Sequence, residues 1–382
     1  MPRKKLMIPG PVDITDEVRQ AMAVPTMPHY GQEWICLLGE TQEMAKQIFG
    51  THSDLYIMAG PGTMALEAAL GSTLEPGASV IIPSNGFFAD RLVSLVEALH
   101  LTPIEVSAPM GAPVLPAAVE AAIVEHPEAQ ALAVVHHETS TGVLNPLEEI
   151  AGIARAHDLL IIVDAVSSLG GVPLSVDAWG IDCCVTVANK ALETPPGLAL
   201  LSVSPRAWQM VEGREARRGW YLDLKTWRWY VENWGDWHPS PVTMPTSNLY
   251  ALNRSLSLLL EEGLEARYEK YRWACTVVRR GLESLGFSML AEEAYASPLT
   301  TAFRIPPHID ASDLKQWLCD EAGVWISGGI GSLKGKILRV GHIGLAREQD
   351  YIISFLLGVE EYLIQQGVEI RRGQSLTALD VA

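Results

Sequence analysis

The chain has 382 residues, of which 48% are hydrophobic, and a formal net charge of −17. The length is enough for a large domain and a smaller one, and the hydrophobic content excludes wholesale disorder. The acidic balance argues against a nucleic-acid or anionic-membrane partner, because both require basic patches. The five cysteines include no CxxC pair and no apolar run is long enough to span a bilayer, so we expect a cytoplasmic protein with reduced thiols and no metal site.

The first part of the chain alternates between two kinds of segment. Residues 1–14 are predicted to form an extended arm, because the prolines around Gly10 oppose regular structure. After two predicted helices, short apolar runs alternate with helix-period segments, which is typical of a largely parallel sheet with crossover helices. The last two runs have no helix between them, so we expect them to pair antiparallel. The predicted strands are 55–59, 80–83, 103–106, 131–135, 159–163, 183–188 and 198–203.

The pattern changes after about residue 205. A long helix is predicted over 247–285, broken near Gly263, and the shorter strands and helices beyond it are typical of a compact α+β unit. The sequence therefore predicts an α/β fold with a mixed, mostly parallel seven-stranded sheet and flanking helices. We expect a large domain over 15–258 and a small C-terminal α+β domain over 259–382.

Tryptophans crowd a short segment, 220–237, which we expect to be irregular. Two interpretations are open: contact with another subunit, or a wall of a substrate pocket. We favour the subunit contact, because tryptophan is enriched at protein interfaces.

Lys190 lies between the last two predicted strands. Burial there would lower the pKa of its amine, and a neutral amine can form a Schiff base with an aldehyde such as pyridoxal 5'-phosphate (PLP). Asp164 ends the most apolar predicted strand, at the edge of the sheet where ligands bind in α/β folds. A carboxylate at this position can keep the pyridine nitrogen of PLP protonated. The alternatives are a surface lysine in a turn and an aspartate that caps a loop.

Three further segments follow predicted strands. Gly62 and Thr63 open a helix whose first N–H groups can bind a phosphate. Phe88 can stack on a flat heterocycle or pack in the core. The adjacent histidines at 136 and 137 point to opposite faces of a strand, which disfavours a metal site, and we expect Thr139 or Glu138 to face the phenolic oxygen of a bound ring.

Arg339 lies in an apolar predicted strand near the C-terminus. Its planar fork suits a carboxylate, and an internal salt bridge is the alternative. Because no other candidate arginine is evident, neutral amino acids are favoured over dicarboxylates as substrates.

Three motifs, 137–142, 163–171 and 189–197, occur in an order that resembles class-V (fold-type I) PLP-dependent aminotransferases. The likeness is to the alanine–glyoxylate, serine–glyoxylate and serine–pyruvate group and runs nearly end to end. It implies a homodimer with active sites at the interface. It also implies these roles: Lys190 forms the Schiff base and moves the proton, Asp164 pairs with the pyridine nitrogen, Val166 and Phe88 flank the ring, Gly62 and Thr63 hold the phosphate, Thr139 lies near the ring oxygen, Thr243 reaches the phosphate from the neighbouring subunit, and Arg339 with the Gly10 backbone binds the substrate carboxylate.

The resemblance implies transfer of an amino group from a small amino acid, alanine or serine, to a 2-oxo acid, glyoxylate or pyruvate. A pyridoxamine–pyruvate or ureidoglycine–glyoxylate type is the alternative. A PLP lyase of the cysteine-desulfurase type is disfavoured because the loop 327–332 has no cysteine. A non-catalytic relative is disfavoured because both Lys190 and Asp164 are kept. Pro61, Thr63 and Ser240 depart from residues that relatives use, which leaves the details of the phosphate site open.

Overall fold

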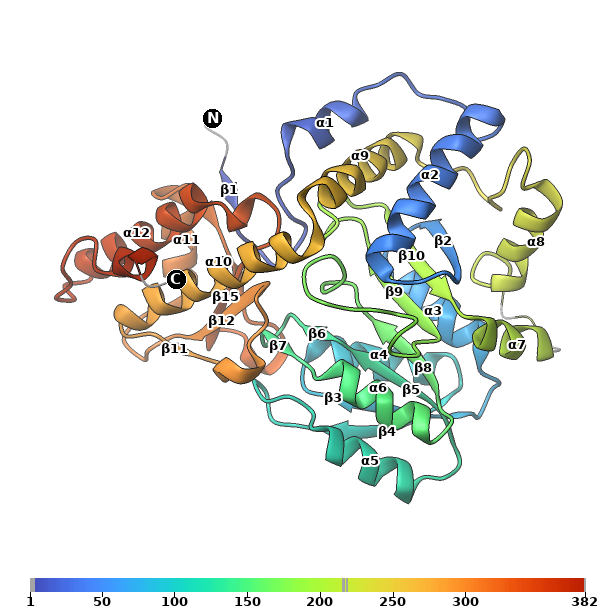
Figure 1. Cartoon of the computed structure of the whole chain (residues 1–382). Coiled ribbons are helices and arrows are strands. Elements are labelled where there is room, and N and C mark those ends of the chain that lie inside the picture. The colour runs from blue at the N-terminus through green and yellow to red at the C-terminus, as the bar shows by residue number, and fades with distance from the viewer. Residues whose placement is uncertain (1–3, 215–216, 218, 381–382) are drawn as a thin grey trace.

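A seven-stranded sheet lies at the centre of the larger part of the molecule (Figure 1). The computed structural model describes residues 4–214, 217 and 219–380. All neighbouring strands are parallel except in the two pairs that β10 makes with β2 and β9. This confirms the mixed, mostly parallel sheet and the antiparallel pairing of the last two runs. The strand order is β2 (Asp54–Ala59), β10 (Leu198–Val203), β9 (Cys183–Val187), β8 (Leu160–Asp164), β5 (Ala129–Val135), β3 (Ser79–Ser84) and β4 (Thr102–Ser107).

Helices cover both faces of the sheet (Figure 1), and the central strands are accordingly rich in apolar residues. Every residue of β8, β9 and β10 is buried, as expected for strands covered on both faces. A short hairpin, β6 (His137–Glu138) with β7 (Val143–Leu144), follows β5. The helices of this part are α1 (Asp16–Met22), α2 (Gln32–Phe49), α3 (Gly62–Thr73), α4 (Phe87–Ala98), α5 (Pro116–Glu125), α6 (Leu147–Ala156), α7 (Pro205–Gly213), α8 (Leu224–Trp234) and α9 (Thr246–Glu262).

The tryptophan-rich segment is a regular helix over Leu224–Trp234, so the prediction of an irregular segment was wrong. The Asp223 side chain accepts a hydrogen bond from the Lys225 N–H and caps the first turn, which favours a helix there. Trp227 is buried, whereas the other tryptophans of this segment are 39–51% exposed. Contact with another subunit stays a prediction.

The C-terminal part is built on a four-stranded antiparallel sheet in the order β11, β12, β15, β14. The predicted break of the long helix is confirmed: α9 ends at Gly263, which has a φ of +82°, and α10 follows directly. The elements are α10 (Leu264–Ser284), β11 (Ser288–Met289), η1 (Glu293–Tyr295), β12 (Thr300–Arg304), α11 (Ala311–Asp320), β13 (Val324–Trp325), β14 (Ser327–Gly328), η2 (Gly331–Leu333), β15 (Ile337–Gly341), η3 (Leu345–Arg347), α12 (Gln349–Gln365) and η4 (Ser375–Asp380).

The N-terminal arm connects the two parts. Its strand β1 (Lys5–Leu6) pairs in parallel with β13, and Met7 is fully buried in the apolar core of the C-terminal part. The carbonyl oxygen of Pro9 then reaches the Lys190 amine. The expected domain boundary after residue 258 falls inside α9, and the domain division stays a prediction.

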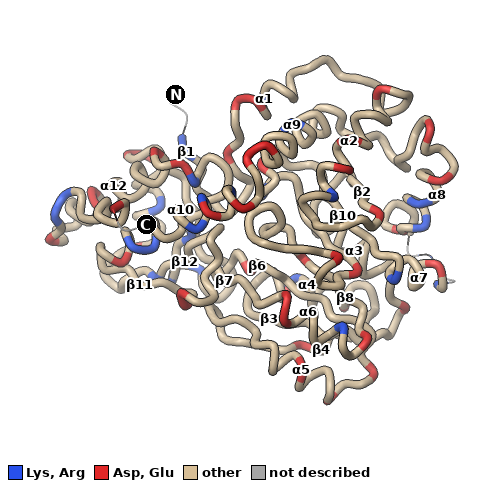
Figure 2. The backbone as a smooth tube through the Cα atoms, viewed as in Figure 1, with Lys and Arg blue, Asp and Glu red and all other residues tan. Residues whose placement is uncertain are grey.

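Charged residues are scattered over the helices and loops of the whole chain (Figure 2). Acidic residues are found on both the large and the C-terminal part, in line with the net charge of −17. Among the residues described, none of the helices combines the length and the apolar character needed to cross a membrane.

Candidate active site

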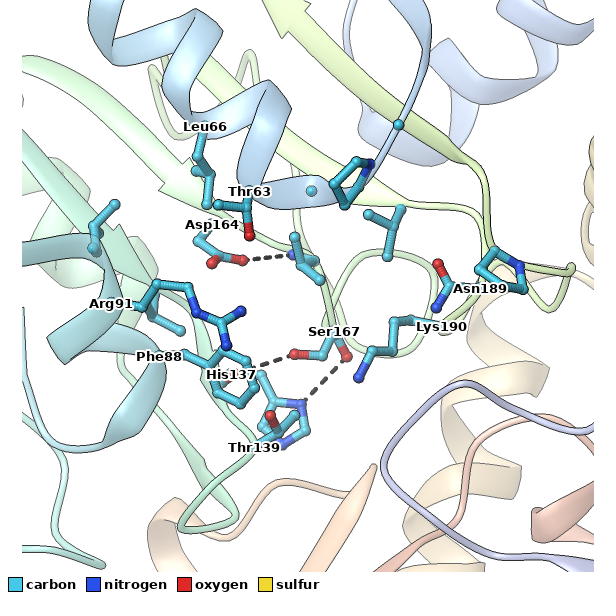
Figure 3. Close-up of a pocket in the computed structure, with 18 of the residues that line it drawn as sticks. Thr63, Leu66, Phe88, Arg91, His137, Thr139, Asp164, Ser167, Asn189 and Lys190 are labelled. Carbon is cyan, nitrogen blue, oxygen red and sulfur yellow. Dashed lines mark hydrogen bonds between the residues drawn. The ribbon is translucent and has the colours of Figure 1, made fainter. Parts of the chain in front are cut away.

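A pocket of about 490 Å³ opens beside the carboxyl ends of β2, β8 and β9 (Figure 3). Ligands bind at this edge in open α/β sheets because the strands end there and the following loops turn away. The residues that the sequence places at different strand ends are thereby brought together. Seven of the predicted site residues line the pocket: Gly62, Thr63, Phe88, Thr139, Asp164, Val166 and Lys190.

Lys190 lies in the turn between the antiparallel strands β9 and β10. Its amine donates a hydrogen bond to the carbonyl oxygen of Pro9 at 2.8 Å. Burial, with a further contribution from Arg339, lowers the pKa of Lys190 to about 8. A Cβ atom at Gly10 would overlap the amine, so the arm can pass this closely only with glycine at that position. A substantial fraction of Lys190 is therefore neutral and nucleophilic near pH 8.

Asp164 is the last residue of β8, and its side chain is held at the pocket by a local hydrogen bond. The backbone N–H of Val166 donates to Oδ1 at 2.9 Å. Burial raises the pKa of Asp164 to about 6, against the opposing effect of this hydrogen bond. No ion pair with another residue is found for Asp164 in the described chain. A buried carboxylate on a pocket wall suits a cationic ligand atom, and the protonated nitrogen of a pyridine ring is such an atom.

The turn from β2 to α3 brings the first N–H groups of α3 to the pocket. A Cβ atom at Gly62 would lie 2.6 Å from Val166 Cγ2 and 3.0 Å from Val187 Cγ1. Glycine therefore permits α3 to begin directly against Val166, in the loop that follows Asp164, and Val187 at the end of β9. Thr63 follows in the first turn of α3 and lines the pocket. A helix N-terminus with a neighbouring hydroxyl suits a phosphate group.

Glu138 holds the start of α4 and does not line the pocket. Of the two residues expected to face the phenolic oxygen of a bound ring, Thr139 is therefore the one that lines the pocket. Glu138 Oε2 accepts hydrogen bonds from the backbone N–H groups of Phe88 at 3.0 Å and Ala89 at 3.1 Å. Its Oε1 accepts from both the N–H and the hydroxyl of Ser140, at 3.0 and 2.5 Å. Glu138 thus caps α4 and fixes the position of Phe88 at the pocket. Burial raises the pKa of Glu138, although these hydrogen bonds oppose the shift.

Arg339 lies in β15 next to the pocket. It donates to the carbonyl oxygens of Thr139 at 2.9 Å and Gly328 at 3.0 Å. Burial lowers the pKa of this guanidinium to about 10. None of the described carboxylates forms the internal salt bridge that the sequence left open, so the charge is held by backbone dipoles and stays available to an anion.

Thr243 lies outside the pocket of its own chain, and Arg91, which was not predicted, lies inside it. Thr243 is exposed and is not among the residues that line the pocket of its own chain, so its reach into a neighbouring subunit stays a prediction. Arg91 lines the pocket and was missed. It follows Phe88 by three residues on α4, and this helical spacing places both side chains on one face. That spacing was the available signal.

The adjacent histidines separate as their spacing predicts. His136 packs against Trp179, with ring centroids 6.2 Å apart, whereas His137 lines the pocket. Burial lowers the pKa of each histidine to about 3, so both are neutral. Within the described part of the chain, no three His, Cys, Asp or Glu side chains gather as metal ligands would.

The aminotransferase class-V family matches residues 14–347. An uncharacterised aminotransferase of Methanocaldococcus jannaschii is 35% identical over 379 residues, covering 99% of this chain and 97% of the relative. The alanine–glyoxylate aminotransferase of Callithrix jacchus is 33% identical and covers 90% and 84%. The crystal structure of ureidoglycine–glyoxylate aminotransferase from Bacillus subtilis superposes with a TM-score of 0.94 at 30% identity, covering 100% of this chain and 98% of that chain.

The chain belongs to the class-V aminotransferase family. The fold and the pocket thus define a transaminase, and the resemblance seen in the three motifs is confirmed. The family as a whole uses PLP, which agrees with the lysine and aspartate on the pocket wall.

Proposed function

We propose that this chain binds PLP and transfers the amino group of a small amino acid, alanine or serine, to glyoxylate or pyruvate. The observation that carries the proposal is that Lys190 and Asp164 line the same pocket. One is a buried amine with a lowered pKa, and the other is a buried carboxylate without an ion-pair partner among the described residues. The alanine–glyoxylate and ureidoglycine–glyoxylate relatives support a small amine donor and a 2-oxo acid acceptor.

The residues of the pocket fit PLP. Asp164 would pair with the pyridine nitrogen, Phe88 and Val166 would flank the ring, and the Gly62–Thr63 turn would hold the phosphate. When bound, PLP supplies an electron-withdrawing ring that stabilises negative charge at the substrate Cα.

The remaining steps belong to the side chains of this chain. Arg339 binds the substrate carboxylate, because its guanidinium is fixed by two carbonyl oxygens and keeps its charge free. Lys190, with a pKa of about 8, removes the proton from the substrate Cα and later returns it.

We further propose a homodimer in which Thr243 of one subunit reaches the phosphate of the other. Exposure of Thr243, and of Trp229 and Trp237 on the neighbouring segment, supports this arrangement. A cysteine-desulfurase type of reaction is disfavoured. Cys319 lies on α11 with its sulfur within hydrogen-bond distance of Lys4 Nζ and Trp325 Nε1, and it does not line the pocket.

A single-turnover experiment tests the proposal. The PLP-loaded protein is mixed with alanine, serine, glycine, aspartate or pyridoxamine, and the absorbance of the bound cofactor is followed. Alanine or serine should convert it to the pyridoxamine phosphate form, and glyoxylate or pyruvate should restore it. A preference for pyridoxamine would favour the pyridoxamine–pyruvate alternative. If no amine converts the cofactor, the proposed activity is wrong.

A further inference from the structure

Arg91 is a cation of the pocket that the proposed mechanism does not use. It lies on α4, one turn after Phe88, and its guanidinium points into the pocket (Figure 3). The guanidinium carbon lies 4.9 Å from the centroid of the Phe88 ring and 5.3 Å from that of the Phe87 ring. These cation–π contacts hold the planar fork beside the site where the cofactor ring would be flanked by Phe88.

The other cations of the site have polar partners, whereas the partners of Arg91 among the described residues are aromatic rings. Lys190 donates to Pro9 and Arg339 donates to two backbone carbonyls. No hydrogen bond or ion pair joins Arg91 to another residue of the described ranges. Its neighbour Asp90 instead accepts a hydrogen bond from the Ser84 hydroxyl. The donors of the Arg91 guanidinium are therefore free for a ligand in the pocket.

The charge of Arg91 acts on two titratable groups of the pocket. It adds a small part to the lowered pKa of Lys190 and opposes the rise in the pKa of Asp164, and both residues lie on the wall of the same pocket. A guanidinium that lines the same pocket as the Lys190 amine and has no carboxylate partner among the described residues suits an anionic ligand. The reacting molecules supply one such group each beyond the α-carboxylate that Arg339 binds: the cofactor phosphate, and the side-chain carboxylate of a dicarboxylic substrate.

We propose that Arg91 is a second anion-binding residue of the active site, which grips an oxyanion with its planar fork. The proposal rests on the proposed aminotransferase function and extends it. The oxyanion belongs either to the cofactor phosphate, which the adjacent Thr63 turn would share, or to a second carboxylate on the substrate. It revises the expectation from sequence that a single arginine restricts the enzyme to neutral amino acids.

Two variants and one control test the proposal. Arg91→Gln removes the charge, and Arg91→Lys keeps the charge but not the fork. Arg280→Gln is the control, because Arg280 is 57% exposed and forms a surface ion pair with Glu293 at 3.7 Å. Thermal unfolding of all proteins establishes that each variant is folded.

The first measurement compares the affinity of the apoprotein for PLP with its affinity for pyridoxal, which lacks the phosphate. If Arg91 binds the phosphate, Arg91→Gln weakens PLP binding about tenfold or more and leaves pyridoxal binding unchanged, with Arg91→Lys in between. The second measurement compares kcat/KM for aspartate with that for alanine. If Arg91 binds a second carboxylate, Arg91→Gln lowers this ratio about tenfold or more.

A selective loss in either measurement supports the proposal and identifies the source of the oxyanion. If both ratios in Arg91→Gln stay within about twofold of wild type and of Arg280→Gln, the proposal is overturned. The cofactor measurement needs no turnover. A chain that binds PLP through Arg91 but converts no amine would therefore contradict the proposed function and leave the inference standing.

Discussion

A buried charge network ties the Lys190 turn to the C-terminal part, and its loss should destabilise the fold. Glu193, three residues after Lys190, accepts hydrogen bonds from Arg267 of α10, from Arg347 at 2.5 Å and from the Tyr271 hydroxyl at 2.8 Å. The side chains of Arg267 and Glu193 are only 3% and 9% exposed. Figure 1 shows α10 running from the large part toward the small one, so the network sits where the two meet.

Glu193→Ala would leave two buried guanidiniums short of a partner. Breaking a buried ion pair by removing one side costs about 3–5 kcal/mol. Arg267 would keep Glu262 at 3.0 Å and the carbonyl oxygens of Gly170 and Ala191 at 2.9 and 2.6 Å. These remaining partners place the expected loss at the lower end, about 3 kcal/mol of unfolding free energy.

The control is Glu265→Ala on α10, the helix that carries Arg267. Glu265 pairs with Arg272 at 2.8 Å, but these side chains are 72% and 50% exposed, so the loss should be below about 1 kcal/mol. Urea unfolding followed by far-UV circular dichroism measures both variants. A loss for Glu193→Ala no greater than for Glu265→Ala would refute the reasoning that burial makes this network stabilising.

The network also predicts a pH dependence. Burial alone would raise the pKa of Glu193, but Arg267 and Arg347 overcome this effect and the pKa is lowered. The stabilisation is therefore fully present above the unfolded-state pKa of about 4.3 and is lost as the pH falls through the folded-state value. The difference in stability between wild type and Glu193→Ala should narrow below about pH 4.

Three further predictions concern the pocket. Asp164→Asn should weaken PLP binding about tenfold to a hundredfold, because it removes the charge opposite the pyridine nitrogen; equilibrium titration of the apoprotein measures this, and unchanged affinity would contradict the assignment. The rate at which PLP binds the apoprotein should rise as the pH passes through about 8, since only the neutral Lys190 amine reacts; a stopped-flow profile flat between pH 6 and 10 would be inconsistent with this pKa. Gly62→Ala should cost about 1–3 kcal/mol of stability, since its Cβ would lie 2.6 Å from Val166 Cγ2. In the control Gly39→Ala the new Cβ meets no atom within 4 Å and should cost nothing; equal effects in urea unfolding would argue against the crowding.

The sequence predicted the sheet well because its strands are buried on both faces and read as apolar runs. It also predicted that Lys190 and Asp164 would share a site, since Asp164 ends β8, Lys190 follows β9, and the carboxyl ends of parallel strands lie at the same edge of the sheet. What it could not predict depends on contacts between distant segments. Glu138 was one of two residues expected near the ring, with Thr139, but it caps a helix 50 residues away in sequence, and nothing in its local pattern indicates that partner.

Arg91 was overlooked for a different reason. Its spacing from Phe88 placed it on the same helical face, but which face meets the pocket depends on how α4 packs. Likewise, the regular helix at Leu224–Trp234 was not predicted because attention fell on its unusual number of tryptophans, although Asp223 is a typical N-cap residue at its start. In both places the local sequence was enough to predict the helical spacing or the helix start, but it could not predict which surface the helix packs against.

The central claim is that Lys190 anchors PLP in this pocket. The most direct test is to load the protein with PLP, treat it with borohydride to make the linkage permanent, and locate the added mass by peptide mass spectrometry. We predict that the cofactor is found on Lys190 and that Lys190→Ala retains none. Attachment at another lysine, or no attachment in the wild-type protein, would contradict the account.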